Sequence, residues 1–337
     1  MGKKVFIIAE AGVNHNGSLK LAKKMVDAAK SAGADAIKFQ TFNSEELVTA
    51  SAPKAAYQKK TVPRKSQLAM LKELELSREE FDDLSKYCRK KKIMFLSTPF
   101  DLQSADFLNG LKLPLFKISS GEITNIPLLT KIAKYKKPII LSTGMSTIDE
   151  VKRALQAIYA AGNRKLTLLH CTSNYPTKYD DVNLKAMLTL KTKFNVPVGY
   201  SDHTEGIEVS VAAVAMGAAV IEKHFTLDKK MAGPDHKASL SPVELAAMVR
   251  AIRNVEKSLG DGIKRPRIAE KGVSRVIRKS LIALSDIARG EKIVLRKIGV
   301  KRPGSGIEPR FMNKIIGKLA NKNIKKDQVL TWDKVKR

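Results

Sequence analysis

Two histidines stand at the ends of two short apolar runs, and a helix-like segment joins the runs. The run that begins at Val198 leads to His203, and the run that begins at Val220 ends at His224. The stretch 208–217 between them is rich in small residues and is typical of a helix. If both runs are parallel strands, their imidazoles lie on one rim. Neutral imidazoles with open coordination positions suit a catalytic divalent metal. The alternative is that two unrelated histidines end two loops.

Six further apolar runs precede this pair, and polar residues follow each of them. They span residues 5–10, 36–40, 93–97, 115–119, 138–142 and 166–170. Segments with helical spacing separate the runs, so strands alternate with helices along the chain. This order predicts an α/β fold of parallel units, and eight such units predict a closed (β/α)8 TIM barrel. An open doubly wound sheet is the alternative, but no Gly-x-Gly-x-x-Gly turn follows a strand.

Reactive groups of such a barrel lie where the strands end. The polar residues at the eight predicted ends are Glu10; Lys38 and Gln40; Ser97 and Thr98; Lys117, Ser120 and Glu122; Ser142; His170, Ser173, Asn174 and Tyr175; Ser201, Asp202 and His203; Glu222 and His224. A turn or a helix cap explains any single end. It does not explain two inward-facing lysines, because lysine is rarely buried without a partner or a task. We therefore predict an active site on this rim.

A chain of 337 residues is too long for one small domain and suits a barrel-sized domain followed by a smaller one. We predict a catalytic barrel over residues 1–260, a linker over 261–275, and a β-rich module over 276–337. Two similar segments occur in this module: 287–293 leads to Lys297, and 324–330 leads to Lys334. Two copies indicate pseudo-symmetry, whereas a solenoid needs at least three.

The net charge of +29 is compatible with nucleic-acid binding, but the 62 lysines and arginines are spread over the chain and aromatic residues make up only 6%. Without a recognisable DNA- or RNA-binding motif, we expect no nucleic-acid partner and a positive field that attracts an anionic substrate. No apolar run reaches 18 residues, so we expect no membrane contact. The first apolar run is too short for a signal peptide, and the two cysteines lie far apart. A cytoplasmic protein with free thiols is the expectation.

Several motifs, in a fixed order over nearly all of the chain, resemble the sialic acid synthase family, the phosphoenolpyruvate-condensing N-acetylneuraminate synthases. The matching segments are 9–17, 38–41, 97–100, 117–122, 142–145, 170–172, 200–204, 222–225 and 233–235. The tail, including residues 301–304, resembles the antifreeze-like C-terminal domain of that family, a SAF domain with a β-clip fold.

The resemblance implies a metal-dependent condensation of phosphoenolpyruvate with N-acetylmannosamine and water, which gives N-acetylneuraminate and phosphate. Mn²⁺ or Mg²⁺ on His203 and His224 would polarise the sugar aldehyde. Within the family, the alternative is a legionaminic or pseudaminic acid synthase that uses a 2,4-diacetamido hexose. Outside it, the alternatives are a Schiff-base aldolase with Lys117 as nucleophile and a basic, non-enzymatic nucleic-acid-binding or ice-binding protein.

The resemblance also implies roles for individual residues. Lys38 and Lys117 match positions that hold the phosphoenolpyruvate anion. Hydroxyl donors to this anion would be Thr98, Ser120, Ser142 and Ser201. Residues that orient the sugar would be Glu10, Gln40, Glu122, Tyr175 and Asp235, with Glu10 and Asp235 near the metal. We predict Glu222, Glu10, His203 and His224 as the catalytic residues, with Glu222 stabilising a cation or moving protons.

Two further positions of the resemblance concern a polar loop and the arrangement of the subunits. Ser173 stands where some family members carry asparagine, and Asn174 follows one place later, so this loop departs from the family pattern. Arg302 matches a residue that reaches the N-acyl group of the sugar from the partner subunit. The resemblance thereby implies a domain-swapped homodimer.

Overall fold

The computed structural model describes residues 4–55, 58–59 and 62–336. The chain divides into two compact units, one that ends at Asp261 and one that begins at Gly262. Each unit has its own hydrophobic core.

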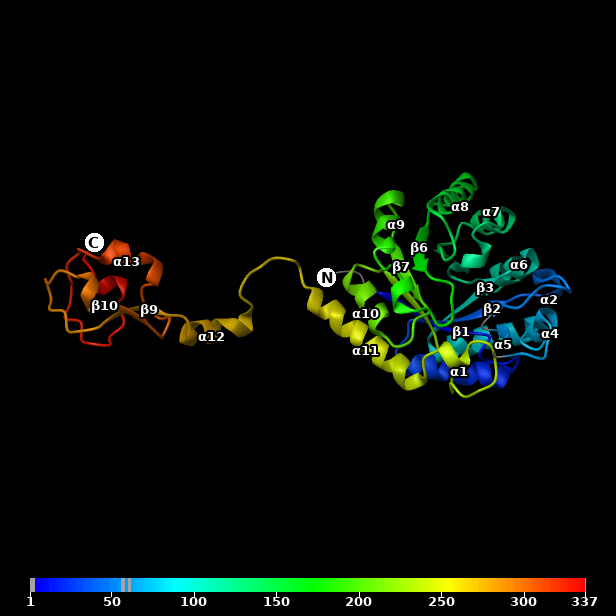
Figure 1. The fold of residues 1–337 in the computed structure, drawn as a ribbon, viewed down its shortest axis with the longest axis horizontal. Helices are drawn as coiled ribbons and strands as arrows, with labels where there is room; N and C mark the ends of the chain where they lie inside the picture. The colour runs from blue at the N-terminus through cyan, green and yellow to red at the C-terminus, as the bar shows by residue number, and fades with distance from the viewer. Residues whose placement is uncertain (1–3, 56–57, 60–61, 337) are drawn as a thin grey trace. The chain divides into compact units, whose positions relative to one another are not determined.

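The first unit is built on one sheet of eight parallel strands (Figure 1). The strands are β1 (Phe6–Gly12), β2 (Ala36–Thr41), β3 (Met94–Pro99), β4 (Phe116–Ile118), β5 (Ile139–Ser142), β6 (Leu166–Cys171), β7 (Val198–Asp202) and β8 (Val220–His224). Their order is β3-β2-β1-β8-β7-β6-β5-β4, and β3 also lies against β4. The sheet therefore curves into a nearly closed barrel, and the predicted TIM-barrel fold is confirmed.

Helices surround this barrel (Figure 1). They are α1 (Leu19–Ser31), α5 (Arg78–Lys91), α6 (Leu102–Gly110), α7 (Ile126–Lys134), α8 (Ile148–Ala160), α9 (Ala186–Phe194), α10 (Glu208–Ala215) and α11 (Pro242–Leu259). Capping residues fix where several of them begin. The side chain of Ser18 caps α1, and full capping boxes of Ser77 with Glu80 and Ser241 with Glu244 start α5 and α11.

A layer of apolar side chains fills the barrel below the strand ends. Its buried members are Ile8, Ala36, Leu96, Ile140, Leu169 and Val220. Each of them stands two residues before a side chain of the strand end: Glu10, Lys38, Thr98, Ser142, Cys171 and Glu222 respectively. Because alternate residues of a strand face the same side, the second set lies directly above the first. The apolar layer therefore closes the barrel beneath a polar layer.

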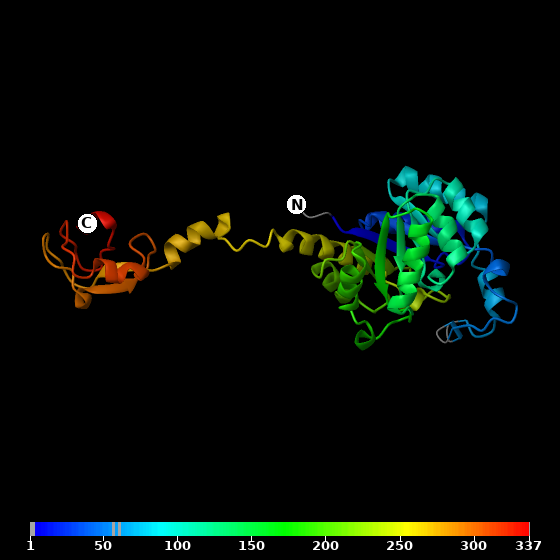
Figure 2. The ribbon, with the colours of Figure 1, turned by 90° about the horizontal axis from the view of Figure 1, so that it is seen from above.

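A segment between β2 and α5 carries the short helices α2 (Ser44–Leu47) and α4 (Gln67–Lys72). The two helices contact each other at one edge of the barrel unit, where Figures 1 and 2 show them in blue. Val13, Phe42, Met70, Leu71 and Leu74 form a small separate core there. This core attaches the segment to the turn that follows β1.

The second unit contains α12 (Ile268–Ile277), α13 (Met312–Ile315) and an antiparallel pair of β9 (Ser280–Ala283) and β10 (Ile298–Lys301). Helix α12 occupies much of the segment predicted as a linker. The backbone pairs of the unit repeat with an offset of 37 residues. Asp327 N donates to Ala283 O and Gly290 N to Ala320 O, each at 2.8 Å. The reciprocal bonds between Ile287 and Ile324 lie at the centre of this pattern. The predicted pseudo-symmetry is therefore present in the backbone hydrogen bonds.

In the part of the chain that the structure describes, no helix is long and apolar enough to span a membrane.

Candidate active site

Two lysines and two glutamates meet in the polar layer of the barrel. Lys38 Nζ lies 2.8 Å from Glu10 Oε2 and 3.7 Å from Glu222 Oε2, and Lys117 Nζ lies 3.2 Å from Glu222 Oε1. All four side chains are buried, with at most 6% of each accessible to solvent. The side chains come from β1, β2, β4 and β8, so the closure of the barrel brings them together.

Hydroxyl groups surround these charges. Lys38 Nζ donates to Thr98 Oγ1 at 3.1 Å, and Lys117 Nζ donates to Ser142 Oγ at 2.8 Å. Ser201 Oγ donates to Glu222 Oε1 at 3.0 Å. The arrangement offers ammonium and hydroxyl donors around a small space, which is the chemistry that binds a phosphate and a carboxylate.

The two carboxylates of the cluster differ in their protonation. Burial raises the pKa of Glu10 to about 7, against the attraction of Lys38. Burial alone would also raise the pKa of Glu222, but Lys117, Lys38 and the hydrogen bond from Ser201 together lower it to about 2. Near neutral pH, Glu222 is therefore the fixed negative charge and Glu10 exchanges its proton.

The predicted histidine pair is formed. The rings of His203 and His224 have centroids 5.4 Å apart, and the ring of Tyr175 lies 4.1 Å from His203 and 5.4 Å from His224. His203 Nδ1 hydrogen bonds with Thr172 O at 2.8 Å and approaches Cys171 Sγ at 3.7 Å. Three rings from the ends of β6, β7 and β8 thus face one another.

The histidine pair fits a divalent metal. His224 Nδ1 is buried and has no hydrogen-bond partner among the described residues, and burial holds the pKa of His224 well below its usual value. The ring is therefore neutral with a lone pair available, as a metal ligand requires. Across residues 4–55, 58–59 and 62–336, no three His, Cys, Asp or Glu side chains are grouped to hold a metal. A metal held by these two imidazoles alone would keep coordination positions for substrate oxygen and water, and we would expect it to bind weakly.

The predicted sugar-orienting residues lie around this centre. Gln40 Nε2 is 3.5 Å from Glu10 Oε1. Burial raises the pKa of Asp235 to about 6, and the nearby imidazole of His203 acts against this rise. Glu122 lies further out on the rim, where its Oε2 accepts a hydrogen bond from Asn125 at 2.7 Å. Arg302 belongs to the second unit, and its contact with the sugar stays a prediction.

Ser120 and Ser173 meet at Gly144. Gly144 N donates to Ser120 Oγ at 2.9 Å, and a Cβ on Gly144 would come within 2.3 Å of Ser173 Oγ and 3.2 Å of Cys171 Sγ. Only glycine leaves room for this approach. Cys171 is a free thiol, as expected, and it also lies between these hydroxyls and His203. Its position two residues after Leu169 on β6 was the available signal, because it faces inward by strand alternation.

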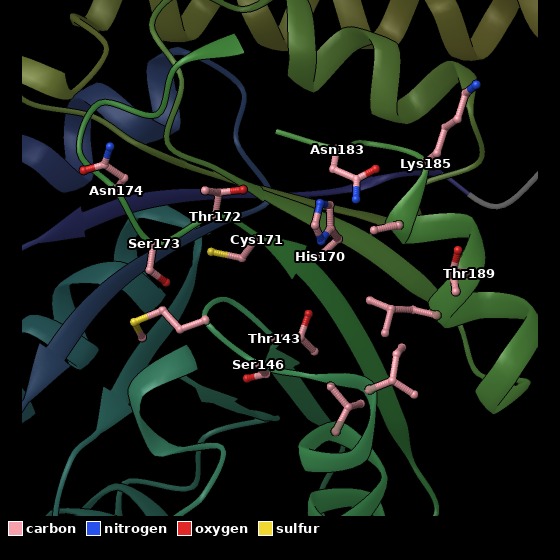
Figure 3. Close-up of a pocket in the computed structure, with 15 residues that line it drawn as sticks. Thr143, Ser146, His170, Cys171, Thr172, Ser173, Asn174, Asn183, Lys185 and Thr189 are labelled. Atoms are coloured by element: carbon pink, nitrogen blue, oxygen red, sulfur yellow. The ribbon is translucent and has the colours of Figure 1, made fainter. Parts of the chain in front are cut away.

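A pocket of about 590 Å³ opens beside the site (Figure 3). It lies over the ends of β5 and β6, with Thr143 and Ser146 on one side, and Asn183, Lys185 and Thr189 on the other. Cys171 and Ser173 line it as well, but neither lysine of the charged cluster does. This pocket therefore adjoins the histidine end of the site and does not contain the charged cluster.

Comparison with known proteins identifies the family of this chain. The NeuB family profile matches residues 25–264, and the SAF domain profile matches residues 278–336. The N,N'-diacetyllegionaminic acid synthase of Campylobacter jejuni is 51% identical over 331 residues, covering 97% of this chain and 99% of that protein. The protein of the same name from Legionella pneumophila is 48% identical over 335 residues, covering 98% and 94% respectively.

A solved structure gives the same picture. The N-acetylneuraminic acid (sialic acid) synthetase of Leptospira borgpetersenii matches with a TM-score of 0.71 and 39% identity, over 80% of this chain and 90% of that one. The chain belongs to the NeuB family and carries a SAF domain. It is an enzyme of the phosphoenolpyruvate-condensing transferase class, a sugar acid synthase, as the motifs predict.

Proposed function

We propose that this enzyme condenses phosphoenolpyruvate with the open-chain aldehyde of a 2,4-diacetamido hexose to form a legionaminic acid. The sequence motifs alone favour N-acetylmannosamine over a diacetamido hexose. The order is reversed here because both legionaminic acid synthases share more of this sequence than the sialic acid synthetase does.

The single observation that carries the reaction class is the convergence of Lys38 and Lys117 on Glu222 within the barrel. The two ammonium groups would hold the phosphate and the carboxylate of phosphoenolpyruvate, with Thr98, Ser120, Ser142 and Ser201 donating hydrogen bonds. A multiply charged anion that enters this buried site gains strong attraction, because few water molecules screen it.

In the reaction, carbon 3 of phosphoenolpyruvate attacks the aldehyde carbon, and the aldehyde oxygen gains a proton to become a hydroxyl. Positive charge develops at carbon 2, where Glu222 is the permanent negative charge. Water adds to carbon 2 and loses a proton, and the tetrahedral intermediate expels phosphate to leave a 2-keto acid. Glu10, with a pKa of about 7, suits the transfer of one of these protons.

His203 and His224 would hold a divalent cation, Mn²⁺ or Mg²⁺, which when bound acts as a Lewis acid toward the aldehyde oxygen. Tyr175 fixes the orientation of both imidazoles through ring contacts. Gln40, Glu122, Ser173 and Asp235 would bind hydroxyl and amide groups along the sugar. Arg302 would complete the site from the SAF domain of a partner subunit in a homodimer.

One assay tests this proposal. Phosphate release from phosphoenolpyruvate is measured with N-acetylmannosamine and with the 2,4-diacetamido hexoses that lead to legionaminic and to pseudaminic acid, each with and without EDTA. We expect the largest kcat/KM with the legionaminic precursor and no turnover in EDTA. A larger kcat/KM with N-acetylmannosamine would make the enzyme an N-acetylneuraminate synthase. A larger kcat/KM with the precursor of pseudaminic acid would make it a pseudaminic acid synthase.

A Schiff-base aldolase is the second candidate, because burial lowers the pKa of Lys117, as a nucleophilic lysine requires. Against it, the Lys117 ammonium contacts Glu222 and Ser142, which favour its charged form. Borohydride reduction in the presence of pyruvate distinguishes the two. We expect no covalent adduct by mass spectrometry, and an adduct on Lys117 would support the aldolase.

A further inference from the structure

Asp235 lies in a long loop that follows β8. The loop runs from Phe225 to the start of α11, and its regular elements are a single bridge between Phe225 and Leu240 at its base and a short 3-10 turn at His236–Ala238. Nevertheless the Asp235 side chain is buried beside His203. A loop of this length needs specific contacts to keep one carboxyl group in place, because its backbone is otherwise free to move.

The turn after β1 supplies contacts on one side of Asp235. Asn14 Nδ2 donates to Phe225 O and to Ser239 Oγ, both at 2.9 Å, and Ser239 Oγ in turn donates to Asp235 O at 2.7 Å. Asn14 is 1% exposed, so these bonds are shielded from water. One amide group thus joins the end of β8 to the backbone of Asp235.

The same turn also makes hydrogen bonds to the residues on both sides of Asp235 in the loop. Asn16 Nδ2 donates to Ala232 O at 2.9 Å, and Asn16 Oδ1 accepts from His236 Nε2 at 3.1 Å. The second ring nitrogen of His236 hydrogen bonds with Thr226 Oγ1 at 2.6 Å. Asn16 therefore fixes the residue that follows Asp235 as well as a carbonyl three places before it.

Gly233 shows how closely the two segments pack. A Cβ at this position would lie 2.6 Å from His236 Cδ2 and 2.9 Å from Asn16 Oδ1. A side chain on residue 233 would therefore push the loop away from the turn. The contact between the loop and the turn therefore depends on glycine at position 233.

We propose that Asn14 and Asn16 are positioning residues that hold Asp235 against the sugar end of the site. They act through the loop backbone, and neither touches the charged cluster. The proposal rests on the proposed function only in taking the ligand of Asp235 to be the sugar. It assigns a task to the Asn-His-Asn turn, for which the sequence analysis gave no role.

The test uses Asn16→Gly in the full chain. Asn16 has φ of 50°, a left-handed conformation that glycine adopts without strain, so this change removes the side chain and little else. We expect the KM for the sugar to rise roughly tenfold, because two hydrogen bonds that order the loop are lost. The Kd for phosphoenolpyruvate, measured by calorimetry, should change less than about twofold.

The matched control is Asn163→Gly. Asn163 Nδ2 donates to Lys137 O at 2.7 Å and its Oδ1 accepts from Lys165 N at 3.0 Å, so it makes the same kinds of bond in the turn before β6. That turn lies at the opposite end of the barrel from the strand ends that form the site. This variant should lower the melting temperature but leave the sugar KM within about twofold.

A double-mutant cycle separates positioning from general stability. If Asn16 acts through Asp235, Asn16→Gly adds less than about twofold to the sugar KM in an Asp235→Ala background. A full additional tenfold effect there would overturn the proposal. So would an equal weakening of sugar and phosphoenolpyruvate binding.

Hydrogen exchange supplies a reading that needs no substrate. Amides of residues 226–240 should exchange roughly tenfold faster in Asn16→Gly and in Asn14→Ala than in the wild type. Unchanged exchange in both variants would refute the positioning role whatever sugar the enzyme uses. If the enzyme prefers another N-acyl sugar, the proposed function fails, and the KM measurements are made with that sugar.

Discussion

Glu222 lies between Lys117 and Lys38, with Lys117 Nζ 3.2 Å from one carboxylate oxygen and Lys38 Nζ 3.7 Å from the other. In a buried site these charges stabilise one another, and removing Glu222 leaves Lys117 without a carboxylate while Lys38 keeps only Glu10. An incoming anion competes with Glu222 for the same two ammonium groups. Removing the charge of Glu222 therefore makes the net charge of the site more positive and strengthens its attraction for an anionic substrate.

The first prediction concerns Glu222→Gln. Turnover should fall by roughly 10²-fold or more, because the fixed charge opposite carbon 2 is lost. Phosphoenolpyruvate should bind at least as tightly as in the wild type, since Glu222 no longer competes for the two ammonium groups and only Glu10 remains beside Lys38. Calorimetry measures the affinity, and phosphate release measures the turnover.

Thermal denaturation checks the same variant in a second way. Without ligand, Glu222→Gln should melt at a lower temperature, because Lys117 loses its carboxylate. Saturating phosphoenolpyruvate should raise the melting temperature of the variant more than that of the wild type. An unchanged turnover, or a loss of phosphoenolpyruvate binding, would show that Glu222 has another role.

The second prediction concerns the pH dependence of stability. Burial raises the pKa of Glu10 from 4.5 to about 7, so the folded protein holds a proton that the unfolded chain releases. The contribution of Glu10 to the free energy of unfolding therefore falls as pH rises from 4.5 to 7, by roughly 3 kcal/mol in total. The pKa of Glu222 is shifted downward, to about 2, and its contribution is lost only below pH 4.5.

Urea denaturation followed by circular dichroism at pH 5 and pH 7 tests this sign. Glu10→Gln removes the titrating group, so its free energy of unfolding should fall less between the two pH values than that of the wild type. Asp235 titrates in the same direction, with a pKa of about 6, but is common to both proteins. Parallel pH profiles would mean that Glu10 keeps an ordinary pKa in the folded state.

Strand alternation is the reason that so much of the fold and site could be predicted from the sequence. On β8, Glu222 and His224 face the interior, and Lys223 faces the helices, where it pairs with Asp202 of β7 at 2.9 Å. Once eight strands are recognised, the residue two places after each inward apolar side chain lies in the polar layer. The charged cluster and the histidine pair follow from that pattern.

Contacts between loops could not be predicted in this way. Asn14 and Ser239 are 225 positions apart, and nothing in the spacing of either loop indicates that they meet. The position of Cys171 could not be predicted from cysteine spacing, because spacing indicates metal sites and disulfides, whereas Cys171 lies against a histidine. The helix α12 was read as a linker because Gly, Pro and charged residues precede it, although its own sequence has helical spacing.

The third prediction concerns the metal. His203→Ala and His224→Ala should each abolish turnover and the enhancement of water proton relaxation by bound Mn²⁺, because one imidazole alone holds the ion too weakly. His170→Gln is the matched control. His170 also lies at the end of β6, but its Nε2 hydrogen bonds with Val182 O at 2.8 Å, so it should keep the metal. Mn²⁺ binding that survives in His224→Ala would place the ion elsewhere.

The fourth prediction concerns the pair on the outer face of β7 and β8. Lys223 Nζ also donates to Thr204 O at 2.6 Å, and Asp202 accepts from Ser210 Oγ at 2.6 Å. Lys223→Met leaves the Asp202 charge buried without a cation, so the free energy of unfolding should fall by about 3–5 kcal/mol. The double variant with Asp202→Asn should recover part of that loss. If Lys223→Met alone costs less than about 1 kcal/mol, the pair is not a buried ion pair in solution.

The fifth prediction concerns the proposed exchange of SAF domains between subunits. Arg302→Ala and His224→Ala should each be inactive alone, because one removes the sugar contact and the other a metal ligand. Co-expressed with different tags and purified as mixed dimers, the two chains should regain activity if each SAF domain serves the partner's barrel. The Arg302→Ala chain then supplies an intact barrel, and the His224→Ala chain supplies the intact arginine above it. One working site in two gives about half of the wild-type kcat per dimer. If instead each SAF domain serves its own barrel, every site in the mixed dimer carries one lesion, and phosphate release stays at the level of the single variants.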